Sequence, residues 1–121
     1  MNYVDAIEYL ESRLNYEVRG MPARAELRID RTALLLSHLG DPHKAYPIIH
    51  VAGTKGKGST ASMTASLCGE QYAKVGLHVS PHLIRVEERF RVNGVMIAPE
   101  TFASLVEKLL PIVNIVDRIL H

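Results

Sequence analysis

The sequence predicts an α/β fold in which helices flank a parallel sheet. A short apolar run over residues 48–52 leads into a glycine-rich turn, and a helix-forming stretch follows that reaches about Tyr72. A second short apolar run covers residues 75–79. The order strand, glycine turn, helix, strand is a βαβ unit, which implies parallel strands and a right-handed crossover.

Two helices are expected before this unit. Apolar residues recur at spacings of four, three and four from Tyr3 to Leu14, which indicates one face of a helix. Residues 15–26 contain Gly and Pro and are expected to form a loop. The second helix has Asp30 as its expected N-cap and Gly40 as its C′ glycine, and the Pro after Asp41 prevents its continuation.

A hairpin and a last helix are expected after the unit. Asn93 and Gly94 separate two apolar-rich segments, residues 89–92 and 95–97, which is a strong hairpin signal. A helix then begins at Pro99 and is expected to be interrupted at Pro111. The chain stops in an apolar tail without a terminating signal, so we expect it to be a fragment of a larger domain or to need a partner.

The composition is that of one small soluble domain. The chain has 121 residues, of which 47% are hydrophobic, and a net charge of +1. This balance gives no reason to expect a nucleic-acid-binding or membrane-binding surface. There is no signal-like N-terminus and no apolar run near the roughly 18 residues of a membrane span. Cys68 is the single cysteine, and a cytoplasmic location is expected.

The glycine-rich turn has the chemistry of a phosphate-binding loop. A strand before it and a helix after it let backbone N–H groups and the positive helix end face an anion. The usual P-loop expression is not met, because Val51 stands at its first glycine and Gly58 follows Lys57. What remains is three glycines, one cation for the phosphates and two hydroxyls. The predicted ATP-binding residues are Gly53, Thr54, Lys55, Gly56, Lys57, Gly58, Ser59 and Thr60.

A second candidate segment, residues 80–82, follows the run over residues 75–79. It lies at the carboxyl end of that strand, where ligands bind in open α/β sheets. By itself, Ser80 before Pro81 is also a common turn arrangement. His82 has the alternative of a solvent-exposed side chain.

Four ordered motifs resemble the folylpolyglutamate synthase and dihydrofolate synthase family, within the Mur ligase superfamily. Residues 53–59 resemble its loop G-T-(N/K)-G-K-G-S, and residues 35–42 are similar to L-L-x-x-L-G-N-P. Residues 74–83 resemble K-V-G-x-Y-(T/S)-S-P-H-L, and residues 88–94 resemble E-R-I-x-(V/I)-N-G. The glycine between Lys57 and Ser59 is typical of the folate branch rather than of the cell-wall ligases.

The resemblance implies an ATP-dependent ligase that adds L-glutamate to folates, to dihydropteroate or to both, in folate and one-carbon metabolism. It implies ATP and Mg²⁺ as cofactors, a catalytic role for Lys57 at the phosphates, Ser80 as a metal ligand and His82 beside the folate pocket. It also implies that residues 1–46 form a helical segment packing on an ATP-binding domain, of which 47–121 are the N-terminal part. The fold implied is the Mur ligase central ATPase domain.

The family's remaining metal ligands and its C-terminal domain have no counterpart among these 121 residues. The chain alone is therefore expected to be inactive and to require the rest of its polypeptide. Three alternatives stay open: a related Mur-type amide ligase acting on another carboxylate, a nucleotide-binding module that does not catalyse, and a degenerate fragment.

Overall fold

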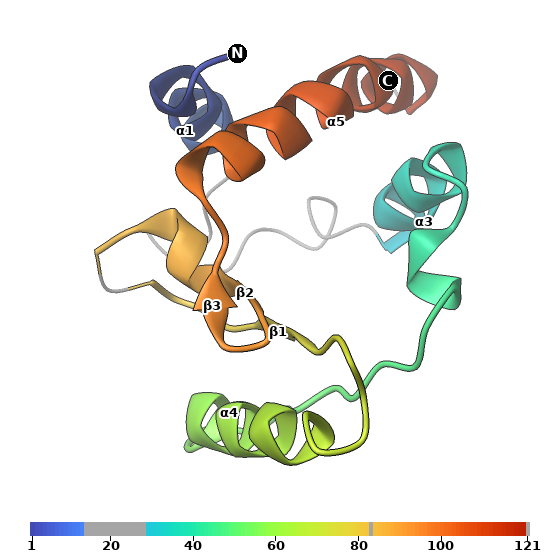
Figure 1. The fold of residues 1–121 in the computed structure, drawn as a ribbon. Helices are drawn as coiled ribbons and strands as arrows, with labels where there is room; N and C mark the ends of the chain where they lie inside the picture. The colour runs from blue at the N-terminus through green and yellow to red at the C-terminus, as the bar shows by residue number, and fades with distance from the viewer. Residues whose placement is uncertain (14–28, 83, 121) are drawn as a thin grey trace. The chain divides into compact units, whose positions relative to one another are not determined.

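The computed structural model describes residues 1–13, 29–82 and 84–120. They belong to two compact units, each considered by itself. The helical unit comprises Met1–Ile48 and Ala103–His121, and the sheet unit comprises Ile49–Phe102. Figure 1 gives the order of the elements along the chain. In the part of the chain that the structure describes, no helix combines the length and the apolar character that a membrane crossing requires.

The first helices of the helical unit agree with the sequence pattern. Helix α1 spans Tyr3–Ser12, and its N-cap is Asn2, whose side-chain oxygen accepts a hydrogen bond from the Asp5 amide. Helix α3 spans Ile29–His38, followed by the short 3₁₀ helix η2, Pro42–Lys44. Gly40 adopts the expected left-handed conformation, with φ of +83°. The predicted loop over residues 15–26, and Leu14, lie outside the described residues.

One detail of helix α3 was predicted wrongly. Asp30 is not the N-cap, because the helix already includes Ile29 and Asp30 lies in its first turn. A carboxylate there is favourable for the same electrostatic reason, since the N-terminal end of a helix carries partial positive charge. A cap and a first-turn acid are therefore difficult to distinguish from sequence alone.

Helix α5, Pro99–Ile119, continues through Pro111, which corrects the predicted interruption. A proline inside a helix removes one backbone hydrogen bond and crowds the carbonyl four residues earlier. The helix nevertheless buries Phe102, Ala103 and Val106 before the proline and Val116 after it. Burial of apolar side chains on both sides of Pro111 offsets that local cost.

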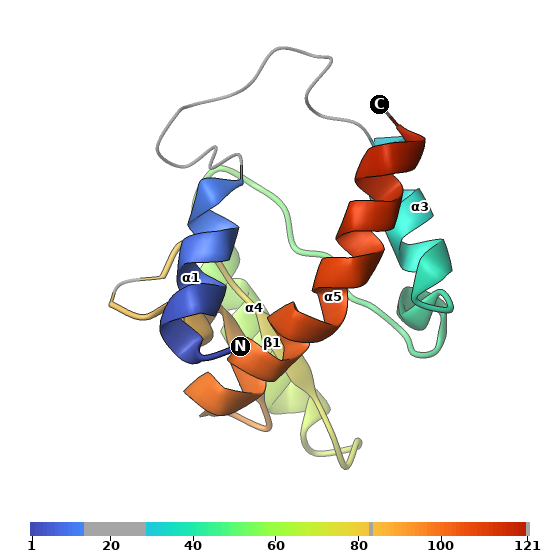
Figure 2. The same ribbon diagram turned by 90° about the horizontal axis from the view of Figure 1, so that it is seen from above.

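Helix α5 is connected to both other helices of its unit by ion pairs. Arg13 donates from Nη1 and Nη2 to the two carboxylate oxygens of Asp117, at 3.0 and 3.3 Å. Arg31 Nη1 lies 3.5 Å from Asp117 Oδ1, and the terminal amine of Met1 lies 2.9 Å from Glu107 Oε1. Figure 2 shows α1 and α3 on opposite sides of α5. The end of α1 and the start of α3 are thus both linked to the Asp117 carboxylate of α5.

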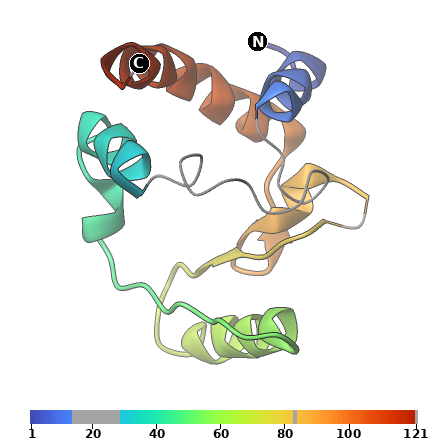
Figure 3. The ribbon, with the colours of Figure 1, turned by 180° about the vertical axis from the view of Figure 1, so that it is seen from behind.

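The sheet unit consists of one long helix and three short strands. Helix α4 spans Lys57–Cys68 and contacts strand β1, Gly76–His78. The 3₁₀ helix η3, Val86–Arg89, precedes β2, Phe90–Val92, which forms a hairpin with β3, Val95–Met96. Figures 1 and 3 both show α4 running along one side of this sheet.

The sheet is antiparallel, with strand order β1-β2-β3. The run over residues 48–52 has no regular secondary structure and is not part of a strand, and Ile48 and Ile49 are 61% and 65% exposed. An isolated extended segment has no ladder of hydrogen bonds, because a strand needs a neighbour. The expected parallel pairing between this run and residues 75–79 is therefore not found among the described residues.

The hairpin forms at the predicted place. Asn93 and Gly94 have φ of +51° and +80°, the two left-handed residues that a tight two-residue hairpin turn requires. His78 pairs with Phe90 in the ladder, and their rings lie 5.1 Å apart. Helix α4, in contrast, ends at Cys68 rather than near Tyr72, since the chain reverses there through bonds from the Gln71 and Tyr72 amides to the Cys68 carbonyl.

Candidate functional site

The predicted phosphate loop, residues 53–60, leads directly into the first turn of helix α4. Gly53 and Gly56 have φ of +151° and +74°, in the region that favours glycine. Gly56 is the N-cap of α4 and offers no side-chain bond to the first turn. The Thr60 amide bonds the Gly56 carbonyl at 2.9 Å. The amides of the three residues before Thr60 have no carbonyl within the helix, so this end can bind an anion.

Lys57 is the first residue of α4, and its aliphatic chain lies over the loop. A Cβ added at Gly53 would be 3.9 Å from Lys57 Cγ and 3.9 Å from the Lys55 carbonyl oxygen. All residues from 53 to 60 are exposed. The loop therefore presents its amides and its lysine to solvent, and these groups fit the charge of a phosphate chain.

The other loop residues have distinct positions. Thr54 and Lys55 form the bend before Gly56, while Gly58, Ser59 and Thr60 belong to the first turn of α4. The Thr60 carbonyl accepts a hydrogen bond of 2.8 Å from the Thr64 hydroxyl.

Ser80 follows β1, and the Ser80–Pro81 peptide bond is cis. Helix α4 and β1 contact each other and are joined through residues 69–75, so the chain reverses between them. The start of α4 and the carboxyl end of β1 consequently lie at the same end of the sheet unit. Among the described residues, however, no hydrogen bond or ion pair joins the glycine loop to Ser80 or His82.

His82 is half-buried and is bound to a residue that the sequence did not single out for the site. Arg89 Nε donates to His82 Nδ1 at 2.9 Å. The alternation of Arg85, Arg89 and Arg91 along the sequence is explained most simply by a solvated strand face, with cations for a polyglutamate tail as the alternative, and neither interpretation signals this contact. Only the antiparallel pairing of β1 with β2 brings Arg89 back to the start of the 80–82 segment.

Glu87 and Glu88, the two acidic residues directly before Arg89, make further contacts. Glu88 Oε2 accepts hydrogen bonds from the amides of Ile84, at 3.0 Å, and Arg85, at 3.3 Å. Arg85 Nε lies 3.3 Å from Glu87 Oε1, and Glu87 is fully buried. These contacts fix the turn of η3 that leads to Arg89.

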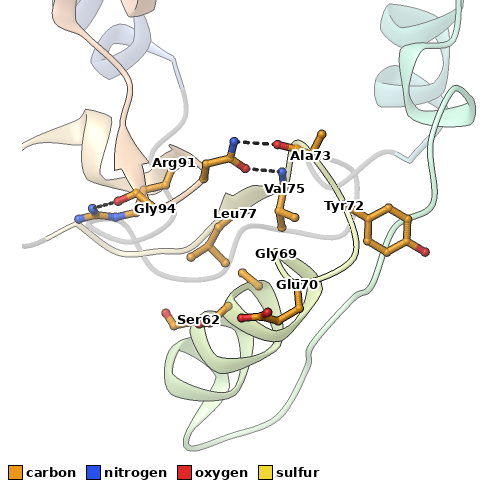
Figure 4. A pocket seen from close by; sticks show the side chains of 12 residues that line it. Ser62, Gly69, Glu70, Tyr72, Ala73, Val75, Leu77, Arg91 and Gly94 are labelled. Atoms are coloured by element: carbon orange, nitrogen blue, oxygen red, sulfur yellow. Dashed lines mark hydrogen bonds between the residues drawn. The ribbon is translucent and has the colours of Figure 1, made fainter.

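A cavity in the described part of the chain lies away from the predicted site. Its volume is about 550 Å³, and it opens between α4 and the hairpin (Figure 4). Its lining includes Ser66, Tyr72 and Arg91, but no residue of the glycine loop and neither Ser80 nor His82. The groove faces the C-terminal half of α4 and is therefore separate from the glycine loop.

Ser80 is the residue that the sequence predicts to bind a metal ion. Within the described ranges, no group of three or more His, Cys, Asp or Glu residues is placed to hold a metal ion. A serine hydroxyl is an oxygen ligand of the kind that Mg²⁺ accepts, together with waters and phosphate oxygens. Ser80 is exposed and fits the role of one such ligand.

Two curated proteins resemble the chain over most of its length. A Haloferax volcanii protein, a probable bifunctional folylpolyglutamate synthase/dihydropteroate synthase, is 39% identical over 111 residues, 92% of this chain and 12% of the relative. The dihydrofolate synthase/folylpolyglutamate synthase of Bacillus subtilis is 36% identical over 116 residues, 96% of this chain and 25% of the relative. No family model matches the chain.

Solved structures give the same result. The crystal structure of Thermotoga maritima folylpolyglutamate synthase has a TM-score of 0.80 and 35% identity, and the match covers 96% of this chain and 25% of that one. A folylpolyglutamate synthase complex with AMPPCP and folate has a TM-score of 0.81 and 28% identity, with coverages of 98% and 27%.

These structures confirm the expected fold class, an α/β domain of the Mur ligase type, of which the described antiparallel sheet is a part. The chain spans about a quarter of the length of the B. subtilis relative and of both solved structures. The sequence identity and the structural agreement, taken together, show that this chain belongs to the folylpolyglutamate synthase/dihydrofolate synthase family.

Proposed function

We propose that the chain carries the ATP-binding loop of an ATP-dependent ligase that joins glutamate to folates, to dihydropteroate or to both. One observation carries the proposal most directly: Gly56 is left-handed and caps α4 without a side-chain bond, directly before Lys57. This geometry leaves the first-turn amides and a lysine for an anion. The named relatives support the substrate class, and one related structure contains AMPPCP with folate.

The proposed reaction has two steps. A carboxylate oxygen of the folate or pteroate substrate attacks the γ-phosphorus of ATP, and ADP leaves, which gives an acyl phosphate. The amine of glutamate then attacks the acyl carbon, and inorganic phosphate leaves as the amide forms. Positioning and charge neutralisation contribute most of the catalysis in such phosphoryl transfers.

Each predicted residue has a role in this proposal. Lys57 neutralises charge at the β- and γ-phosphates, and the amides of residues 53–60 bind phosphate oxygens. Ser80 is one ligand of the Mg²⁺ that accompanies ATP. His82 lies beside the folate or pteroate substrate.

The wider organisation is also a proposal. Residues 1–46 form a helical segment and residues 47–121 the first part of the ATP-binding domain of a longer protein. The remaining metal ligands and the glutamate site belong to the rest of that protein, which is required for activity. We infer a cytoplasmic location, because folate, glutamate and ATP are intracellular metabolites.

The proposal is tested by activity of the complete gene product with Mg²⁺, ATP, glutamate and either a folate or dihydropteroate. Formation of ADP that depends on both other substrates is expected, and Lys57→Ala is expected to abolish it with little change in fold. Lys74→Ala is the matched control, since Lys74 is an exposed lysine outside the loop. Turnover only with another carboxylate would favour a different Mur-type ligase, and ATP binding without turnover would favour a non-catalytic module.

A further inference from the structure

Arg89 contacts the chain on both sides of the Ser80–Pro81 dipeptide. Before it, the Val79 amide donates to the Arg89 carbonyl at 3.1 Å. After it, Arg89 Nε donates to His82 Nδ1 at 2.9 Å. One residue of a neighbouring segment therefore restrains Val79 and His82, and Ser80 lies between the two restrained positions.

The bond between the two side chains orients the imidazole of His82. An arginine Nε can only donate a hydrogen bond, so His82 Nδ1 must be the acceptor. This contact fixes the orientation of a side chain that stands two residues after Ser80.

Arg89 is itself firmly held. Its neighbour Phe90 pairs with His78 in the β1–β2 ladder, and the Phe90 ring lies 6.3 Å from Phe102. On the other side, Glu88 bonds the amides of Ile84 and Arg85, which closes the turn of η3. Arg89 is thus restrained by the β1–β2 ladder on one side and by the η3 turn on the other. A side chain restrained in this way can also restrain the residues that it binds.

We propose that Arg89 is a positioning residue that fixes Ser80, through Val79 and His82, for the divalent cation that accompanies ATP. The inference rests on the proposed function, because it requires Ser80 to be a metal ligand. Arg89 touches neither the metal nor ATP in this role. The Arg89 side chain restrains residues 80–82, and removal of that side chain lets Ser80 move away from the metal position.

Arg91 provides a matched control. It lies two residues further along the same chain segment, but its Nη1 donates to the Gly94 carbonyl at 3.3 Å, within the hairpin turn. Removal of Arg91 therefore takes away an arginine of similar location and charge, without a contact to residues 79–82.

The test is a Mg²⁺ titration of the complete gene product with two readouts, ATP binding followed by calorimetry and ATP-dependent turnover. Arg89→Ala removes one charge-assisted hydrogen bond and is expected to raise the half-saturating Mg²⁺ concentration about fivefold or more. Arg91→Ala is expected to leave that concentration unchanged. Ser80→Ala, which removes the ligand itself, is expected to raise it at least as much.

Two variants of His82 separate positioning from other effects. His82→Asn retains a side-chain oxygen at the position of Nδ1 that can accept from Arg89, so its Mg²⁺ requirement is expected to stay near that of the unmodified protein, whatever its turnover number. His82→Ala is expected to resemble Arg89→Ala, and combining the two is expected to add little. A cooperative thermal transition at an unchanged temperature checks that each variant is folded.

The outcomes distinguish the two proposals. If Ser80→Ala shifts the Mg²⁺ titration and Arg89→Ala does not, the role of Arg89 is refuted and the ligase assignment remains. If Arg89→Ala instead raises the KM for the folate substrate at constant Mg²⁺ requirement, Arg89 binds substrate and the positioning role is wrong. If Ser80→Ala changes nothing, the metal assignment fails and this inference fails with it.

Discussion

Asn93 holds the main chain of Val75 through two hydrogen bonds. The Val75 amide donates to Asn93 Oδ1 at 2.8 Å, and the Asn93 amide donates to the Val75 carbonyl at 2.9 Å. A third bond runs from Asn93 Nδ2 to the Ala73 carbonyl at 3.0 Å, and Figure 4 shows the two side-chain bonds. The hairpin turn thereby fixes the connection between α4 and β1, and with it the direction in which β1 leads to Ser80.

Substitutions of Asn93 are expected to destabilise the protein in a defined order. Asn93→Asp keeps the acceptor for Val75 but loses the donor to Ala73, which costs about 1 kcal/mol in unfolding free energy. Asn93→Gly loses both side-chain bonds at a tolerated positive φ, for about 1–2 kcal/mol. Asn93→Ala adds about 1 kcal/mol of left-handed strain. Denaturant unfolding measures the series.

A wild-type stability of Asn93→Gly would show that the side-chain bonds contribute nothing. Equal stabilities of the Gly and Ala variants would show that the left-handed conformation is not retained. Substitution of Gly94 by alanine is expected to lower the stability more than substitution of Asn93, since the φ of Gly94, +80°, belongs to the same turn.

The Asp117 network predicts a difference between two ion pairs on helix α5. Asp117 is 24% exposed in its side chain and bonds two arginines, whereas Glu107 is 59% exposed and, among the described residues, pairs with the terminal amine alone. Asp117→Asn is expected to lower the unfolding free energy by about 1 kcal/mol, and Glu107→Gln by less than about 0.5 kcal/mol. Thermal unfolding at low and high salt compares the two, and equal effects would contradict the network.

The pH dependence of the Arg13–Asp117 contact follows from the direction in which the pKa of Arg13 is shifted. The hydrogen bond to Asp117 raises the pKa of Arg13, although burial acts against it. A cation whose pKa is raised by folding contributes stability below its ordinary pKa and loses that contribution only as the pH rises above it. The effect of Arg13→Gln on stability is therefore expected to be constant across the neutral range, and a strong change between mildly acidic and mildly basic buffer would contradict this.

Two of the three glycines of the loop, Gly56 and Gly58, are expected to respond oppositely to alanine. Gly56 is left-handed, and a Cβ there would meet nothing within 4 Å, so Gly56→Ala costs only backbone strain, about 1–2 kcal/mol. Gly58 lies inside α4 with open space around it, so Gly58→Ala is expected to gain about 1 kcal/mol from helix propensity. Unfolding curves test this contrast, and a loss of stability in both variants would disprove the local geometry.

Local signals in the sequence predicted much of the fold. The Asn93–Gly94 turn and the Gly40 helix end both depend on backbone conformations that few residues adopt. Such requirements are visible in the sequence because glycine and asparagine are the residues that meet them. The start of α4 was expected within residues 58–60, and the helix begins just before them, at Lys57.

Features that depend on distant partners could not be predicted in this way. The run over residues 48–52 reads as a strand, but strand formation needs a neighbour that no local pattern specifies. The helix through Pro111 survives because apolar side chains are buried on both sides of the proline. The contact of Arg89 with His82 arises from the β1–β2 register, which spacing alone does not reveal.

The central claim is that residues 53–60 bind the phosphates of a nucleoside triphosphate. Calorimetric titration of the complete gene product with ATP and Mg²⁺ tests it most directly, with Lys57→Ala and Lys74→Ala compared in the same buffer. We predict saturable binding that Lys57→Ala weakens at least about tenfold and that Lys74→Ala leaves unchanged. Absence of binding, or equal affinity in all three proteins, would contradict the claim.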